Sequence, residues 1–158
     1  MNFESTRYSV TKASKIDKKD ILRFYKGQNY RARFIGQDDC YFIKHNNKII
    51  ACSMISAGKE KQQFWLLHAL VTDIGFRNCG LARTLLHTIQ SPTIRPNYPY
   101  IVCFADNQLH KFYLANNFRY CDPLTDIPRL PVPLQAKYYS YCKQQPQLNC
   151  YLYSATNN

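Results

Sequence analysis

The chain has 158 residues, of which 46% are hydrophobic and 20% are charged. This length and composition are typical of one globular domain with its own core, so we expect residues 1–158 to form a single domain. No apolar run approaches transmembrane length, and the first residues lack the apolar segment of a signal peptide. The sequence therefore predicts a cytoplasmic protein without a membrane partner.

The seven cysteines are scattered along the chain and form no C-x-x-C pair, which favours reduced core thiols over disulfides and predicts no metal cofactor. The formal net charge is +11, and residues 1–50 hold 11 basic and five acidic residues. A basic protein favours polyanionic partners, although a solvated surface is the simpler interpretation. Nucleic acid is therefore an alternative partner that the sequence does not favour.

The first third of the chain predicts a strand, a helix and a hairpin. Residues 7–13 alternate in polarity as a strand does, and Asp17 is a suitable N-cap for a helix that ends near Tyr25. We expect one face of this helix to hold Ile21, Leu22 and Tyr25. Residues 40–45 and 48–56 read as strands joined by a two-residue Asn46-Asn47 turn, which suits positive φ at both positions.

The middle of the chain predicts a strand–helix–strand unit. An apolar strand spans about residues 64–72, a turn holding Gly75 and Gly80 follows, and residues 81–89 form an amphipathic helix. A second apolar strand spans residues 100–106, and a right-handed crossover would place the two strands in parallel. A further helix follows over residues 107–118.

The last part of the chain predicts a short strand at 119–122, a helix at 134–144 and a closing strand at 148–154. Strands that follow one another through short turns pair antiparallel. The predicted fold class is therefore α+β, with a mixed, mostly antiparallel central sheet flanked by helices.

A strand followed by a glycine-containing turn and a helix N-terminus makes a natural anion site, because unpaired backbone N–H groups converge at the positive end of the helix dipole. The segment Arg77-Asn-Cys-Gly80-Leu-Ala82 provides such a turn. It resembles the Arg/Gln-x-x-Gly-x-Gly/Ala motif of the GNAT superfamily of acyl-CoA-dependent N-acyltransferases.

A second motif supports this resemblance. Phe112, Tyr113 and Phe118 stand at the spacing of the family's "Phe-Tyr-x-x-x-Gly-Phe" helix ending. Asn117 replaces the usual glycine, and Asn is the next-best residue for a left-handed helix C-cap. The resemblance covers roughly residues 40–120 and implies a GNAT-like fold.

The resemblance implies that acetyl-CoA is the cosubstrate. The family's pyrophosphate-binding loop corresponds to the backbone of Arg77, Asn78, Cys79, Gly80, Leu81 and Ala82, with Arg83 close to the phosphates. The backbone of Val71, Thr72 and Asp73 would align the pantetheine arm. Asn107 and Asp106 compete for the family's cofactor-side Asn position. Cys79 is expected to be a spacer in the loop, because the family transfers the acyl group directly.

Tyr113 matches the family's general acid, which protonates the leaving thiolate. A packed core tyrosine is the competing interpretation, and the offset of five residues from Phe118 favours the functional one. His68 is the best general-base candidate, and a hydrogen-bonded core histidine is the competing interpretation; Asp73 and Glu60 are the runners-up. We expect His45 at the end of a hairpin, and His87 and His110 on the surfaces of two helices.

We therefore expect an enzyme, an acetyl-CoA-dependent N-acetyltransferase that acetylates a primary amine of a small molecule or peptide by direct transfer. Two alternatives remain open: acetylation of aminoacyl-tRNA by a toxin-like GNAT protein, and a catalytically silent CoA-binding regulatory module. The protein would act as a monomer or homodimer.

Overall fold

The computed structural model describes residues 8–31, 38–57 and 63–157. Its strands are β1 (Val10–Lys12), β2 (Asp39–His45), β3 (Lys48–Ala57), β4 (Phe64–Thr72), β5 (Tyr100–Asp106), β6 (Arg119–Cys121) and β7 (Leu148–Ser154). The α-helices are α1 (Lys18–Gly27), α2 (Leu81–Ile89), α3 (His110–Ala115) and α4 (Val132–Gln144). Among these residues no helix is long and apolar enough to cross a membrane.

The strands form one sheet in the order β1-β2-β3-β4-β5-β7-β6. β4 pairs with β5 in parallel, whereas β1 with β2, β5 with β7 and β6 with β7 are antiparallel. This confirms the predicted α+β class with a mixed, mostly antiparallel sheet. The predicted parallel crossover from β4 to β5 is also present.

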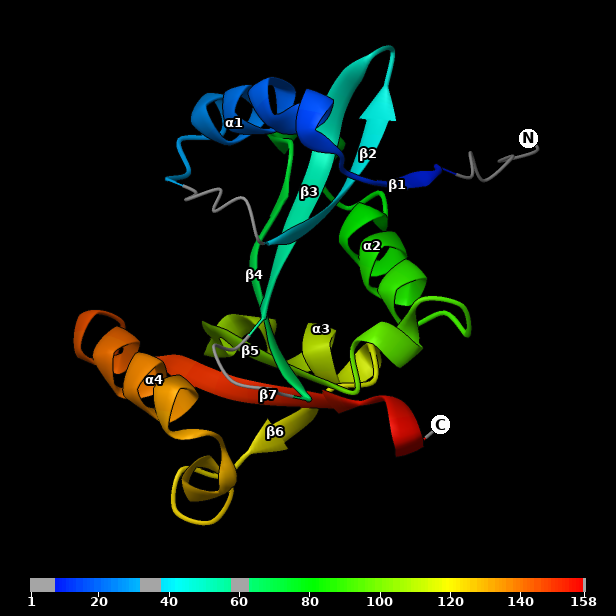
Figure 1. Ribbon diagram of the computed structural model, residues 1–158. Helices are drawn as coiled ribbons and strands as arrows, with labels where there is room; N and C mark the ends of the chain where they lie inside the picture. Colours follow the sequence, from blue (N-terminus) through cyan, green and yellow to red (C-terminus); the bar gives the residue numbers. More distant parts are fainter. Residues whose placement is uncertain (1–7, 32–37, 58–62, 158) are drawn as a thin grey trace, which may run out of the picture. The chain divides into compact units, whose positions relative to one another are not determined.

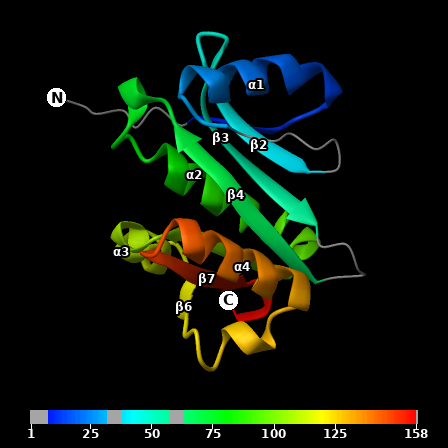
Figure 2. The ribbon, with the colours of Figure 1, turned by 90° about the vertical axis from the view of Figure 1, so that its left-hand side faces the viewer.

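The chain divides into two compact units, which are described separately (Figures 1 and 2). The first unit holds residues 1–54 and 69–89, and the second holds residues 55–68 and 90–158. Both β3 and β4 therefore begin in one unit and end in the other. A single domain over residues 1–158 stays a prediction.

In the first unit, α1 lies against β2 and β3 in both views (Figures 1 and 2). Its buried residues pack into a core with strand residues; the members are Ile21, Phe24, Tyr25, Cys40, Phe42, Ile49, Cys52, Met54 and Ala69. Asn46 and Asn47 have φ of 50° and 62°, as the predicted hairpin turn requires.

Asp17 is the N-cap residue of α1, as predicted, but another expectation for this helix was wrong. Leu22 is 39% exposed, and Phe24 takes the buried position instead, because Ile21, Phe24 and Tyr25 follow the helical i, i+3, i+4 spacing. The Asp17 side chain makes no cap bond to α1 and instead accepts from the Ser14 N–H at 2.9 Å. This carboxylate stabilises the preceding 3₁₀ turn, Lys15–Asp17.

In the second unit, α4 lies along β7 (Figures 1 and 2). One face of this part of the sheet shares a core with α4 and the segment before it; the buried members are Leu66, Val102, Cys121, Ile127, Leu130, Leu134, Tyr138, Leu148, Cys150 and Leu152. The helix predicted over 107–118 is shorter, because a 3₁₀ turn (Asn107–Leu109) precedes α3. Asn117 has φ of 70°, as the left-handed C-cap predicts.

β4 has an irregular backbone at its middle. Its ladder with β5 runs from Phe64–Tyr100 to Leu67–Cys103. Two residues beyond the last pair, Ala69 has φ of 53°, a left-handed conformation that is rare for alanine. Such a residue interrupts the regular backbone of a strand, as a β-bulge does.

Candidate functional site

The loop after β4 is held at its start by Asp73. The Asp73 Oδ1 atom accepts from the Gly75 N–H at 2.8 Å, and the Phe76 N–H donates to the Asp73 carbonyl at 2.9 Å. These bonds close the 3₁₀ turn Ile74–Phe76. Asn78 and Gly80 then take positive φ values of 64° and 76°, which turn the chain into α2.

The N-terminus of α2 leaves backbone N–H groups ahead of the helical ladder. The Thr84 N–H donates to the Gly80 carbonyl at 3.0 Å, so Gly80 is the residue that begins the ladder. The N–H groups of Leu81, Ala82 and Arg83 precede this bond and have no acceptor earlier in the helix. They lie at the positive end of the helix dipole, which favours an anion.

The surroundings of this N-terminus fit a diphosphate. A Cβ atom built on Gly80 meets no atom within 4 Å, so the backbone is open to a ligand. Arg77, Asn78, Cys79 and Arg83 are all exposed. The Cys79 Sγ atom contacts the Arg77 carbonyl at 3.6 Å. The predicted cofactor residues of this loop therefore lie together at the N-terminus of α2, and their contact with the cofactor stays a prediction.

The end of α1 is joined to β4 and to this loop. The Tyr25 hydroxyl donates to the Ala69 carbonyl at 2.7 Å, and both residues are buried. The Gln28 Nε2 atom donates to the Asp73 Oδ2 atom at 2.8 Å, and the Ile74 N–H donates to Gln28 Oε1 at 3.3 Å. No local sequence pattern predicts these bonds, which join residues more than 40 positions apart.

Val71 and Thr72 lie at the end of β4 and are partly buried, while Asp73 follows the strand. The Asp73 N–H donates to the Ile50 carbonyl at 2.7 Å, so this N–H is already engaged within the sheet. Both Asp73 carboxylate oxygens accept hydrogen bonds as well. This bonding favours a structural role for Asp73 over the runner-up role of general base, and Glu60 lies outside the described residues.

His68 lies in the half of β4 that belongs to the second unit. Its Nε2 atom is 2.7 Å from the Ser56 Oγ atom on β3. The ring is partly buried, so it is neither a free surface group nor a fully enclosed core histidine. The contact fixes the orientation of the ring, as a positioned base requires.

Tyr113 lies in α3 of the second unit and is 3% exposed. Its ring stacks on Tyr151 with centroids 5.1 Å apart, and it makes a T-shaped contact with Phe118 with centroids 5.4 Å apart. Burial raises the pKa of the Cys103 thiol to about 12, and a hydrogen bond with Tyr113 offsets part of this shift. The predicted acid is thus a packed tyrosine whose hydroxyl meets a thiol on β5.

His110 is not the simple helix-surface residue that the sequence predicts. Its Nδ1 atom is 3.0 Å from the Tyr151 hydroxyl, which also accepts from the Asn149 side chain at 3.2 Å. Burial raises the pKa of Tyr151 above its ordinary value. The Tyr151 ring is therefore held at its polar end, and Tyr113 stacks on a fixed surface.

Asp106 and Asn107 begin the segment that leads to α3. The Asp106 Oδ1 atom accepts from the Gln108 N–H at 2.8 Å, which makes Asp106 the capping residue of this turn. Asn107 is exposed, and its N–H donates to the Gln147 carbonyl at 2.9 Å. Its cofactor contact stays a prediction.

Several solved structures share this fold. N-acetylglutamate synthase from Neisseria gonorrhoeae, solved with coenzyme A and N-acetyl-glutamate, matches with a TM-score of 0.68 and 15% identity. The match covers 95% of this chain but only 35% of that one, so this chain spans about a third of the synthase.

Two structures of similar length also match. A GNAT-family acetyltransferase from Staphylococcus aureus has a TM-score of 0.64 and 14% identity, over 94% of this chain and 99% of that one. The ribosomal-protein-S18-alanine N-acetyltransferase from Escherichia coli has a TM-score of 0.64 and 8% identity, over 94% of each chain. At these identities the likeness shows the fold alone.

No curated protein matches the sequence. The sequence model described as "Acetyltransferase (GNAT) family" matches residues 8–118, which is more than half of the chain and includes both motifs. With the mixed sheet and the glycine-led N-terminus of α2 already described, this match settles the family. The chain belongs to the GNAT family of acetyltransferases.

Proposed function

We propose that the protein transfers the acetyl group of acetyl-CoA directly to a primary amine of a small molecule or peptide. The observation that carries this proposal is Gly80, whose φ of 76° leads into α2 with no atom near its missing side chain. A backbone that is open and rich in unpaired N–H groups suits a pyrophosphate.

The residues from Arg77 to Arg83 would hold the cofactor. The N–H groups at the start of α2 donate to phosphate oxygens, and the two exposed arginines add positive charge. Acetyl-CoA supplies the activated acetyl thioester when it is bound. The family and the coenzyme A in the synthase structure support this choice of cosubstrate.

The chemistry needs a neutral amine and a proton donor. An alkyl ammonium has a pKa of about 10.4, so its neutral form is roughly 4–5 kcal/mol uphill at pH 7. We assign proton removal to the His68 imidazole, whose ring is oriented by Ser56. We assign proton donation to the Tyr113 hydroxyl, which matches the family's acid in sequence.

One observation favours a second candidate, a silent CoA-binding module. Tyr113 is almost fully buried and its hydroxyl contacts Cys103, which is also the environment of a purely structural tyrosine. Titration calorimetry with acetyl-CoA, followed by a turnover assay on a panel of primary amines, separates the two. Binding with turnover supports the enzyme, and binding without any turnover supports the silent module. If acetyl-CoA does not bind at millimolar concentration, both candidates fail.

A further inference from the structure

A hollow of about 440 Å³ lies at the C-terminal end of α1 in the first unit. Its lining residues are Leu22, Tyr25, Lys26, Asn29, Tyr30 and Arg31. Sites for small molecules typically measure about 300–1,000 Å³, so the hollow has the size of a small-ligand site. The described part of the chain thus offers a binding space outside the anion-binding loop.

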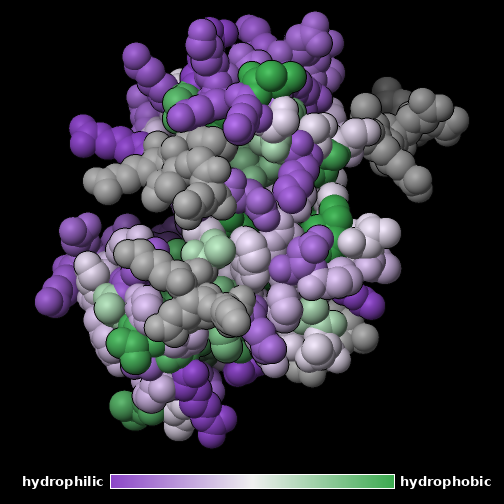
Figure 3. All heavy atoms as spheres, in the orientation of Figure 1, coloured by the Kyte–Doolittle hydropathy of each residue, from purple (hydrophilic) through white to green (hydrophobic). Residues whose placement is uncertain are grey.

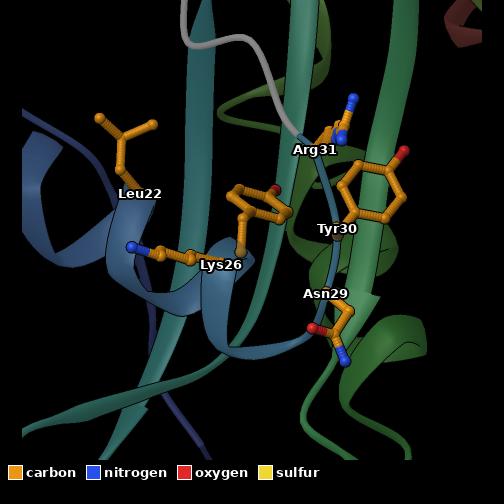
Figure 4. Close-up of a pocket in the computed structure, with 6 residues that line it drawn as sticks. Leu22, Lys26, Asn29, Tyr30 and Arg31 are labelled. Atoms are coloured by element: carbon orange, nitrogen blue, oxygen red, sulfur yellow. The ribbon is translucent and has the colours of Figure 1, made fainter.

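The lining combines two positive charges with apolar and aromatic surface. Figure 4 shows Lys26 and Leu22 on the helix, and Asn29, Tyr30 and Arg31 along the segment that follows it. The rings of Tyr25 and Tyr30 are 5.6 Å apart and tilted by 41°. The six lining residues include two cations and no carboxylate. An anionic ligand is therefore favoured there and a cationic ligand is disfavoured.

The surface around the hollow also carries basic side chains, which favour an anionic ligand. Lys15, Lys18 and Lys19 on or just before α1 are exposed, and the surface over α1 is mostly hydrophilic in Figure 3. Their summed field raises the local concentration of an anionic ligand near the hollow. The pocket cations themselves then discriminate between ligands at short range.

Two hydrogen bonds join the hollow to the segment that would align the cofactor. Tyr25, which lines the hollow, donates through its hydroxyl to the Ala69 carbonyl of β4 at 2.7 Å. Gln28, between the lining residues Lys26 and Asn29, donates to Asp73 at 2.8 Å. A ligand in the hollow therefore lies next to side chains fixed on both ends of the Ala69–Asp73 segment.

We propose that this hollow binds the anionic end of the acceptor, so that the substrate is a small primary amine that also carries a carboxylate or phosphate group on an apolar or aromatic body. This inference rests on the proposed function, because it assigns the acceptor of the same reaction. Lys26 and Arg31 bind the anionic oxygens, and the tyrosine rings contact the apolar body.

A matched set of benzylamines tests the proposal. All four share one aminomethyl group and differ at the para position: para-aminomethylbenzoate, para-aminomethylphenyl phosphate, para-aminomethylbenzamide and para-xylylenediamine. We expect at least one of the two anionic compounds to be acetylated with a kcat/KM about 10-fold above that of the benzamide, and the diamine to be the poorest. A preference for the benzoate over the phosphate, or the reverse, identifies the anionic group.

Removing the charge of Lys26 or Arg31 tests whether the hollow causes the preference for an anionic substrate. Lys26→Gln and Arg31→Gln should each lower the ratio of kcat/KM for the preferred anion to kcat/KM for the benzamide by about 5- to 10-fold. This loss is larger than that of a solvent-screened ion pair and smaller than that of a charge-assisted hydrogen bond. Arg23→Gln is the matched control, because Arg23 is an exposed cation of the same helix outside the hollow. A ratio is used because partial unfolding affects both substrates equally.

The outcomes separate this inference from the proposed function. If acetyl-CoA binds but the benzamide or diamine is preferred, or no member of the set is acetylated, the anionic acceptor is wrong. Equal loss of the ratio in Arg23→Gln also contradicts it. If acetyl-CoA does not bind, the proposed function fails. Titration of N-acetylated para-aminomethylbenzoate into the protein then tests, without any reaction, whether the hollow binds an anion. Binding that Lys26→Gln or Arg31→Gln weakens then supports an anion site, and no binding overturns it.

Discussion

The ring of Tyr113 lies nearly parallel to the ring of Tyr151, with centroids 5.1 Å apart and planes inclined by 19°. Tyr151 is fully buried and its hydroxyl contacts His110 and Asn149. Stacking of this kind contributes about 0.5–1.5 kcal/mol beyond area burial. The Tyr113 ring is thus held by packing that does not involve its own hydroxyl.

This geometry makes Tyr113→Phe a clean test of acid catalysis. The phenylalanine keeps the ring on Tyr151 and removes only the proton donor. We expect kcat to fall by about 10²–10⁴-fold, with acetyl-CoA affinity unchanged by calorimetry. Tyr141→Phe is the control, because Tyr141 is 42% exposed in the same unit. An unchanged kcat in Tyr113→Phe would show that the Tyr113 hydroxyl is not the proton donor and that the residue is structural.

Periodicity predicted the elements around the loop well. The apolar run of β4, the stripe of α2 and the run of β5 have the bounds expected from the sequence. Asn46, Asn47 and Asn117 have the positive φ values that turn chemistry predicts. Local sequence suffices for these elements because their residue types have strong intrinsic preferences.

Long-range contacts could not be predicted in this way. No local sequence feature predicts the φ of 53° at Ala69. Its carbonyl accepts a hydrogen bond from the Tyr25 hydroxyl, 44 residues away in the chain. His110 was expected to be a surface residue, but it contacts Tyr151, 41 residues later. Leu22 was expected on one face of α1 with Ile21 and Tyr25, whereas it is exposed and lines an open hollow. Each of these depends on how the elements pack.

A second prediction concerns Gly80. Its φ of 76° is strained for any residue with a Cβ, and a branched side chain would also cover the open backbone. Gly80→Val should cost about 1–2 kcal/mol of stability. It should also weaken acetyl-CoA binding by about 10- to 100-fold, the value of one hydrogen bond to a charged group.

Gly27→Ala is the control for Gly80→Val. A Cβ at Gly27 also meets no atom within 4 Å, but Gly27 lacks the positive φ and lies in α1. This substitution should leave acetyl-CoA affinity unchanged and stabilise the fold by up to about 1 kcal/mol. If calorimetry gives the same acetyl-CoA affinity for Gly80→Val as for the parent protein, the loop does not bind the cofactor.

A third prediction concerns His68. Because imidazole changes its charge between pH 5 and 8, a base at this position makes kcat/KM fall on the acid side of the pH profile. His68→Gln should lower kcat/KM by about 10²–10⁴-fold and remove that acid limb. Ser56→Ala, which removes the 2.7 Å contact, should lower the rate less and keep the limb.

His87→Gln is the control for His68→Gln, because His87 is an exposed histidine of α2. Its pH profile should match that of the parent protein. An acid limb that persists in His68→Gln would show that another group removes the proton.

The last prediction uses the buried hydroxyl of Tyr25. Burial, with a smaller contribution from Cys52, raises the pKa of Tyr25 above its ordinary value of 10.0. The folded state therefore keeps the proton while the unfolded chain loses it, so stability present below pH 10 is lost as the pH rises further. The loss from this one group is about 1.4 kcal/mol per pH unit. Tyr25→Phe removes it.

Urea unfolding between pH 7 and pH 11 measures both consequences. At pH 7, Tyr25→Phe should cost about 1–3 kcal/mol, because the Ala69 carbonyl loses its buried donor. Above pH 10 the unfolding free energy of the variant should fall less steeply than that of the parent protein. Tyr139→Phe should reproduce the parent slope, since Tyr139 is 49% exposed in the folded state. If the slope of Tyr25→Phe also equals that of the parent protein, the Tyr25 hydroxyl ionises in the fold, and its bond to Ala69 does not hold α1 on β4.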